Sequence, residues 1–204
     1  NMAACRRAFG KLGRIMEQVL VVKREKIEKF IAGKNGLITE NVPELLEVIR
    51  NEHEYMPRAE AEERPDFKQI IPYVILRRGD KVFVTRRLNK GGEARLHGKI
   101  SIGVGGHINP VDEQGDMLMK GLWREIHEEV ELQNHGELCS CGFINDDSNS
   151  VGSVHLGACF TLETEGEVSV KETEKLEGLW MTLPELNANY DFMETWTQIA
   201  LEVL

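Results

Sequence analysis

The stretch that decides how this chain folds and acts is REIHEEVEL, Arg124–Leu132. It places four carboxylates within seven residues of a segment that has the pattern of a helix. Like charges three and four residues apart on a helix repel each other by roughly 0.2–0.5 kcal/mol per pair. Glu125, Glu128 and Glu129 share one helical face at this spacing. They form either a solvated acidic face or a cluster that binds a cation.

The rest of this segment predicts one amphipathic helix over residues 117–132. Its apolar residues recur every four positions, at Leu118, Leu122, Ile126 and Val130. That spacing predicts a buried stripe, with the glutamates on a neighbouring face. Arg124 precedes Glu128 by one turn and can orient its carboxylate. Hard divalent cations such as Mg²⁺ bind clustered carboxylate and carbonyl oxygens, which favours the cation-binding interpretation.

The overall composition excludes several classes of function. The 204 residues carry a net charge of −9, whereas extended nucleic-acid surfaces are usually basic. A small anionic substrate is compatible with a local basic pocket on an acidic protein. No run of eighteen apolar residues is present, so no membrane span is predicted. The four cysteines have neither zinc-ribbon nor redox spacing, and as free thiols they favour a cytoplasmic location.

The chain divides by composition into two parts. Residues 1–65 are expected to form an N-terminal extension with one strand and two helices, and Met16 is a candidate natural start. A charged, proline-bounded connector leads to the main domain, residues 66–204. There, β-branched segments flank Gly79-Asp80 and predict a hairpin. Strands around one central helix, with other helices outside, predict an α/β (α+β) sandwich around a mixed sheet.

These residues resemble a known family, the Nudix hydrolases, whose signature is G-x5-E-x7-R-E-U-x-E-E-x-G-U, where U is bulky and aliphatic. The run Arg124–Glu129 fits R-E-U-x-E-E without a gap, and Leu132 fills the last aliphatic place. Asp116 stands where the signature has its first Glu, and Gly105-Gly106 resembles the opening glycines. The resemblance covers roughly residues 69–204 and implies a Nudix-type α/β/α sandwich.

Three departures from the signature have consequences. The spacing from the glycines to Asp116 is four residues too long, which indicates an insertion at NPVD (109–112) or a neighbouring stretch. Asp116 keeps a carboxylate but shortens it. Glu131 stands where the family has a glycine that ends or bends the helix, so the helix is expected to run on by about one turn.

The resemblance implies hydrolysis of a nucleoside diphosphate linked to another moiety, with Mg²⁺ or Mn²⁺ as the cofactor. Glu125, Glu128 and Glu129 are the expected metal ligands and catalytic residues, and Arg124 is expected to orient a glutamate. Further metal ligands are expected from the carbonyl of Gly105 or Gly106 and from Asp116. A general base or extra ligand is expected from a late acidic loop, EGEVSVKETEKLEG (165–178). Glu174 is the first candidate in this loop, followed by Glu172 and Glu177. Glu125 or Glu129 could also be the base.

Basic residues gather before the acidic helix and are candidates for phosphate or ribose contacts, or simply an exposed hairpin and loop. They are Arg86, Arg87, Lys90, Arg95, His97 and Lys99. His107, beside the glycines, either reaches the substrate or caps a turn. The expected partner is a small-molecule nucleotide, and dimerisation is suggested by the resemblance alone.

Two other functions are compatible with the same fold. A ligand-sensing module would bind a nucleotide without catalysis, and metal-dependent turnover would exclude it. The second function is isomerisation of isopentenyl diphosphate, a reaction in which a cysteine and a glutamate work across an allylic carbon. Cys139, Cys141 and Cys159 lack the flanking pattern for that reaction.

Overall fold

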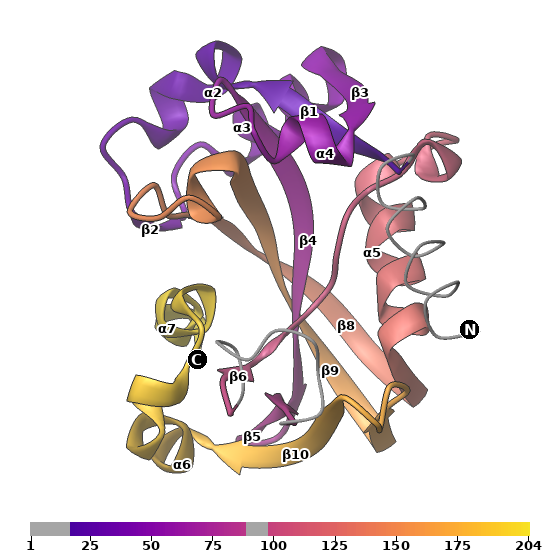
Figure 1. Cartoon of the computed structure of the whole chain (residues 1–204). Coiled ribbons are helices and arrows are strands. Elements are labelled where there is room, and N and C mark those ends of the chain that lie inside the picture. Colours follow the sequence, from indigo (N-terminus) through magenta and orange to yellow (C-terminus); the bar gives the residue numbers. More distant parts are fainter. Residues whose placement is uncertain (1–16, 89–97) are drawn as a thin grey trace, which may run out of the picture.

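A mixed sheet forms the centre of the protein, which the computed structural model describes over residues 17–88 and 98–204 (Figure 1). Its strands are β1 (Gln18–Lys23), β2 (Gly36–Ile38), β3 (His53–Pro57), β4 (Phe67–Arg78), β5 (Lys81–Arg87), β6 (Ile100–Ser101), β7 (Gly103–Val104), β8 (Val130–Asn145), β9 (His155–Val170) and β10 (Leu176–Thr182). The main path runs β10-β5-β4-β9-β8-β2. On this path β4 is parallel to β9 and the other neighbours are antiparallel. The candidate start at Met16 lies outside the described residues.

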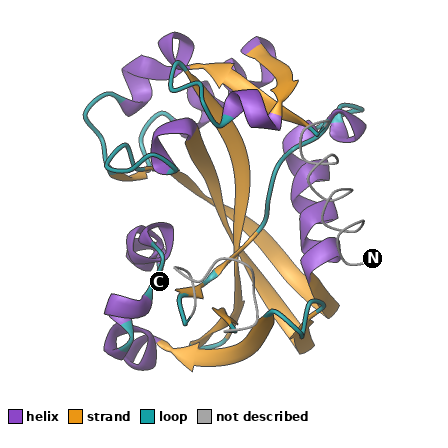
Figure 2. Ribbon diagram, viewed as in Figure 1, coloured by secondary structure: helices purple, strands orange, loops and turns teal. Residues whose placement is uncertain are grey.

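Helices cover both faces of this sheet (Figure 2). They are α2 (Arg24–Ile31), α3 (Val42–Glu52), α4 (Arg58–Ala61), α5 (Met117–Glu129), α6 (Leu183–Ala188) and α7 (Thr195–Ala200). Alternate side chains of a strand point to opposite faces, so β4 serves both layers. Val74 packs in the buried cluster that includes α5, whereas Tyr73 and Ile75 pack in the cluster that includes α7. The predicted sandwich around a mixed sheet is confirmed. None of the described helices is long and apolar enough to cross a membrane.

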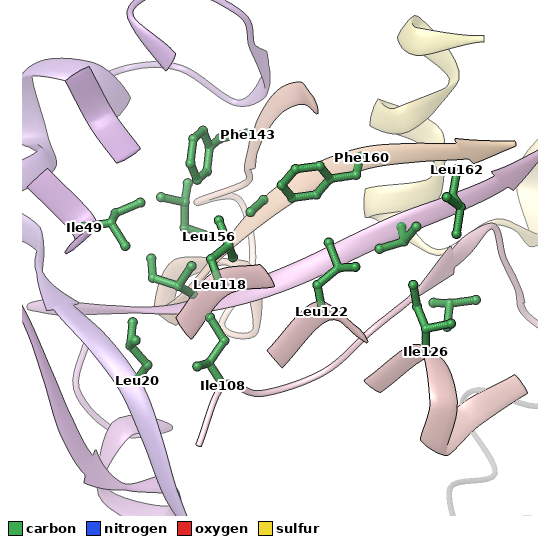
Figure 3. Close-up of a cluster of buried hydrophobic side chains, with 14 of the residues drawn as sticks. Leu20, Ile49, Ile108, Leu118, Leu122, Ile126, Phe143, Leu156, Phe160 and Leu162 are labelled. Atoms are coloured by element: carbon green, nitrogen blue, oxygen red, sulfur yellow. The ribbon is translucent and has the colours of Figure 1, made fainter. Parts of the chain in front are cut away.

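The apolar stripe of the central helix is buried, as its spacing predicts. Its members are Leu118, Leu122, Ile126 and Val130, each at most 3% exposed. Figure 3 shows the side chains of α5 directed toward Leu156, Phe160 and Leu162 of β9. Burial of each such side chain stabilises the fold by roughly 1.5–3 kcal/mol. This row therefore fixes α5 on the sheet and sets the direction of its acidic face.

Residues 17–65 belong to the same sheet and core as the rest of the chain. Val21 of β1 pairs with Gln69 of β4, and Leu37 of β2 pairs with Ile144 of β8. Side chains of β1, α2 and α3 lie in the same buried cluster as α5. The predicted strand and two helices are present, and β2, β3 and α4 are added to them. Residue 66 therefore precedes the start of a strand and does not mark a break in the core.

A partly buried ion-pair network joins this first part of the chain to the loop between β8 and β9. Lys68, which is 0% exposed, donates to Asp147 at 2.7 Å and to the carbonyls of Gly152 and His155. Arg24 donates to both oxygens of Asp147, at 3.1 and 2.5 Å. One carboxylate therefore compensates two cations that come from β4 and α2.

Two elements end where the sequence does not predict. The central helix does not run on past Glu131, because α5 ends at Glu129 and β8 begins at once. Val130 is buried and pairs with Val170 of β9, so the chain continues as a strand here and the helix ends. β9 in turn extends through residues 165–170, expected as part of the acidic loop, because Val168 and Val170 alternate into the core.

Candidate active site

The acidic face of α5 lies at the C-terminal end of the helix, against the glycines that follow β7. Glu125 comes so close to this segment that a Cβ on Gly106 would stand 2.4 Å from its Oε2. Only glycine allows this approach of a carboxylate to the backbone. Glu129, one turn later, lies beside the backbone of Gly105, which acts to lower the pKa of its carboxyl group. Glu128 is 60% exposed and forms the outer edge of the cluster.

Arg124 connects this cluster to the loop that precedes the helix. Its Nε and Nη2 donate to the two oxygens of Asp112, at 3.1 and 2.9 Å, and Nη2 also donates to the carbonyl of His107 at 2.7 Å. Its Nη1 donates to Glu125 at 2.7 Å and to Glu128 at 3.3 Å. The hydrogen bonds to Asp112, which is almost fully buried, raise the pKa of Arg124. Arg124 is therefore a permanently charged positioning residue for two glutamates.

Asp116, expected among the metal ligands, lies at the other end of α5. It is the N-cap residue, accepts a hydrogen bond from the backbone N–H of Met119, and pairs with Arg50 at 3.0 Å. Glu125 stands nine positions further along the helix, a rise of about 14 Å at 1.5 Å per residue. The structure therefore does not bring Asp116 to the glutamates.

Asp112, and not Asp116, stands at the position of the first glutamate in the signature. The spacing Gly106-x5-Asp112 reproduces the G-x5-E of the signature, so a count forward from Gly106 would have found it. The four additional residues then lie after Asp112, in EQGD (113–116), and not in NPVD. They form the approach to α5 and leave the contact between Asp112 and Arg124 intact.

Replacing Asp112 with asparagine is expected to destabilise the protein by about 2 kcal/mol, the range for hydrogen bonds to a charged group. Arg124 would lose its buried counter-charge, and its hold on Glu125 would weaken. Urea unfolding measures the change in the free energy of unfolding. Asp116→Asn is the matched control, because asparagine is also a good N-cap and the pair with Arg50 is exposed. An equal loss in both variants would contradict the assigned role of Asp112.

The carboxylates at the end of α5 are electrostatically crowded. Burial raises the pKa of Glu125 even though Arg124 is next to it. Burial, together with the negative charge of Glu125, raises the pKa of Glu129 to about 7. Over residues 17–88 and 98–204, no three acidic, histidine or cysteine side chains form a ready-made metal cluster. The donors nevertheless fit a hard divalent cation, which binds carboxylate oxygens and would neutralise this excess charge.

A cavity of about 300 Å³ opens beside Glu129, between the sheet and α7. Its lining includes the polar side chains Arg87, Glu129, Glu172 and Glu194 and the aromatic side chains Tyr73 and Trp196. Gly103 makes room for the Tyr73 ring, because a Cβ there would stand 2.0 Å from the ring. The acidic cluster therefore borders a partly open cavity that offers both charge and aromatic surface.

A larger hollow, of about 530 Å³, lies on the opposite part of the molecule, near the junction of β1 and α2. Its charged residues neutralise one another, as in the pair of Arg64 and Asp66 at 2.7 Å. Arg24, which also lines it, is held by Asp147. No acidic cluster of the kind on α5 accompanies it among the residues that line it.

Of the predicted basic residues on β5, Arg87 reaches the cavity. Its Nε donates to Glu194 at 3.3 Å, and its positive charge acts to lower the pKa of Glu129. Arg86 points elsewhere and pairs with Glu177 on the neighbouring strand β10 at 3.5 Å. The alternation of side chains along β5 explains why adjacent arginines differ in this way.

Of the other predicted substrate contacts, the two that the structure describes, Lys99 and His107, are not among the residues that line the cavity. Lys99 donates to the carbonyl of Asp191 at 3.0 Å. His107 is partly buried, lies 2.9 Å from Gln69 Oε1, and has its pKa lowered to about 3 by desolvation. Its ring therefore contacts Gln69 and does not face the cavity lining. Arg95, Lys90 and His97 lie outside the described residues.

In the late acidic loop, Glu172 and not Glu174 faces the cavity. Glu172 lines it, and its negative charge raises the pKa of Glu129. Among the described residues, no contact joins the exposed Glu174 to the cavity, and Glu177 is held by Arg86. The extension of β9 to Val170 leaves only a short turn before β10, which places Glu172 beside the end of α5.

Comparison with known proteins gives relatives over almost the whole chain. The sequence is 38% identical to Protein YmaB of Bacillus subtilis (strain 168), over 95% of this chain and all of that protein. The crystal structure of Tm1382, assigned as a Nudix hydrolase, superimposes with a TM-score of 0.80 at 34% identity, covering 92% of this chain and 97% of that one. No family model matches the sequence.

A more distant structure shares the fold alone. The NUDIX domain of Shewanella oneidensis NrtR, crystallised with ADP ribose, superimposes with a TM-score of 0.51 at 13% identity. The match covers 66% of this chain and 84% of that one. Tm1382, by contrast, is matched over nearly its full length, so the N-terminal part of this chain also has a counterpart there.

Proposed function

The chain belongs to the Nudix hydrolase family, and on that premise we propose that it hydrolyses a phosphoanhydride bond in a nucleoside diphosphate linked to another moiety. The observation that carries the proposal is the placement of Glu129 on the wall of the cavity, with Glu125 held beside it by Arg124. Substrate in the cavity would place its diphosphate next to these carboxylates. A catalytic hydrolase needs this arrangement, whereas a structural domain does not.

The cofactor of the proposed reaction is Mg²⁺ or Mn²⁺, held by Glu125, Glu128 and Glu129. When bound, such an ion neutralises phosphate charge and lowers the pKa of an attacking water. Arg124 orients the glutamates and does not itself reach the cavity lining. Gly105 lines the cavity together with Glu129, and its backbone acts to lower the pKa of that carboxyl group. Glu172 is the acid of the late loop that is placed to accept a proton or a hydrogen bond at this site.

Arg87 is the proposed phosphate contact. Its guanidinium lies on the cavity wall and has a planar set of donors suited to phosphate oxygens. Its present partner, Glu194, holds it by one hydrogen bond. A diphosphate that enters beside Glu129 therefore meets a cation positioned to attract it.

The test is release of phosphate or nucleoside monophosphate from a panel of nucleotides. The panel contains ADP-ribose, NADH, sugar nucleotides, oxidised nucleoside triphosphates, dinucleoside polyphosphates and capped RNA ends. Each is assayed with Mg²⁺, with Mn²⁺ and with a chelator. We expect turnover of one class that requires the metal and is lost in the double variant Glu128→Gln, Glu129→Gln. Binding of a nucleotide without turnover would instead support the sensing module, and turnover in the chelator would contradict the metal assignment.

A further inference from the structure

The start of α7 contributes Glu194 and Trp196 to the lining of the cavity that Glu129 borders. Glu194 is the N-cap residue of this helix, and its backbone N–H donates to the carbonyl of Ile100 at 3.0 Å. The helix is fixed to the sheet by Thr197, whose hydroxyl lies 3.1 Å from that of Tyr73 and accepts the N–H of Ile102 at 3.2 Å. Glu194 is therefore held at a defined place in the lining.

Most other polar side chains of the cavity are already engaged. The hydroxyl of Thr85 donates to the carbonyl of Ser101 at 3.4 Å, and the hydroxyl of Ser101 donates to the carbonyl of Gly103, also at 3.4 Å. Glu172 accepts a hydrogen bond from Lys175 at 2.9 Å. A carboxylate offers about four acceptor positions, and within the described part of the chain Glu194 uses one, for Arg87.

The size of the cavity limits what it can hold. Its volume of about 300 Å³ lies at the lower end of the range for ligand pockets, roughly 300–1,000 Å³. A cavity of this volume has room for one end of a nucleotide conjugate and not for the whole molecule. Trp196, which packs edge-on against Tyr73 with ring centroids 5.7 Å apart, gives this end an aromatic surface.

We infer that Glu194 is a specificity-determining residue that accepts hydrogen bonds from an uncharged, donor-bearing group of the substrate. Such a group is the exocyclic amine of a base or the hydroxyls of a ribose, lying beside Trp196. A second anionic group at this end is rejected, because it would face the carboxylate of Glu194. Arg87 is compatible with a diphosphate beside Glu129 and an uncharged group beside Glu194. A diphosphate in that place would draw the guanidinium toward itself and free a further acceptor on Glu194. The inference rests on the proposed function for the orientation of the substrate.

The test compares the binding of two ligands to the full chain carrying Glu129→Gln, so that hydrolysis does not interfere. The probes are ADP-ribose, which bears donors at both ends, and inorganic tripolyphosphate, which bears charge and no N–H or C–O–H donors. Calorimetry gives each dissociation constant, and quenching of tryptophan fluorescence that is lost in Trp196→Phe places the ligand in the cavity. Adding Glu194→Gln is expected to raise the dissociation constant of ADP-ribose by roughly 10- to 100-fold, the range for a hydrogen bond to a charged group. Tripolyphosphate is expected to bind equally well or more tightly.

Glu202→Gln, on an exposed residue near the C-terminus, is the matched control and is expected to change neither constant. Glu194→Asp keeps the charge and shortens the reach, so it is expected to weaken ADP-ribose without strengthening tripolyphosphate. Equal loss of both ligands, no change for ADP-ribose, or failure of the parent protein to bind ADP-ribose would each overturn the inference. The proposed function is judged separately by metal-dependent turnover and its loss without the glutamates. It can therefore stand when this inference fails.

Discussion

Glu129→Gln is expected to reduce kcat/KM by roughly 100-fold or more, which corresponds to about 2.7 kcal/mol of transition-state stabilisation. Glutamine keeps the size of the side chain but removes the negative charge that the proposed cation requires. The same change is expected to leave the fold intact or to stabilise it slightly. It removes a carboxylate that is buried beside Glu125, and burial of a charge without compensation is unfavourable.

Steady-state kinetics on the active compound of the panel, together with thermal unfolding, test this prediction. Glu131→Gln is the matched control, because it removes a carboxylate two residues along, on β8, that is 72% exposed and pairs with Lys171. That variant is expected to stay within about twofold of the parent activity, since surface changes of this kind have small effects. If Glu129→Gln retained most of its activity, Glu129 would have no part in catalysis. A gain in stability with a loss of activity is the signature of a functional site.

Asp147→Asn is expected to destabilise the protein by about 3 kcal/mol, the lower end of the range for breaking a buried ion pair. The fully buried ammonium group of Lys68 would lose its counter-charge, and Arg24 would lose its two-oxygen contact, because asparagine keeps only one acceptor oxygen. For a protein of this size the loss corresponds to a fall in Tm of roughly 6–12 °C. Thermal and urea unfolding measure it.

The double variant Lys68→Met, Asp147→Asn provides the control for this prediction. It removes the uncompensated charge and is expected to recover much of the lost stability. A loss under about 0.5 kcal/mol in Asp147→Asn alone would show that the network is not stabilising.

The pH dependence of stability gives a second measurement on the same variant. Burial alone would raise the pKa of Asp147, but hydrogen bonds from Arg24 and Lys68 lower it overall. A lowered folded-state pKa contributes stability above the unfolded-state value of about 3.9, and this contribution is lost as the pH falls further. The parent protein should therefore lose more stability in acid than Asp147→Asn does.

The helix that carries the site was predictable because its chemistry is local. The four-residue repeat of Leu118, Leu122 and Ile126 sets one face of α5, and the same periodicity places Glu125 and Glu129 on another. The mixed sheet followed from runs of β-branched residues such as those around Gly79-Asp80. Both patterns are complete within a few turns or one hairpin, so no long-range contact is needed to recognise them.

The rest of the site depends on contacts between distant segments. Glu194 and Trp196 join it only because α7 docks on β4 through Thr197 and Tyr73, more than one hundred residues apart in the sequence. The position of Glu172 depends on the length of β9, which the acidic composition of that segment does not indicate. The signature selects Asp116 when it is aligned from Arg124 and Asp112 when it is aligned from Gly106, and the contact between Asp112 and Arg124 decides between them.

The order of strands also has a consequence for how the protein is made. β2 finds its partner only when β8 has been synthesised, because Leu37 pairs with Ile144. The edge of β4 that pairs with β9 likewise stays unpaired until β9 has been synthesised, since Tyr73 lies opposite Cys159. Pairings between such distant segments slow folding, and their unpaired edges are open to other nascent chains in the meantime. The strands that are synthesised first therefore need shielding from other chains until their partners have emerged.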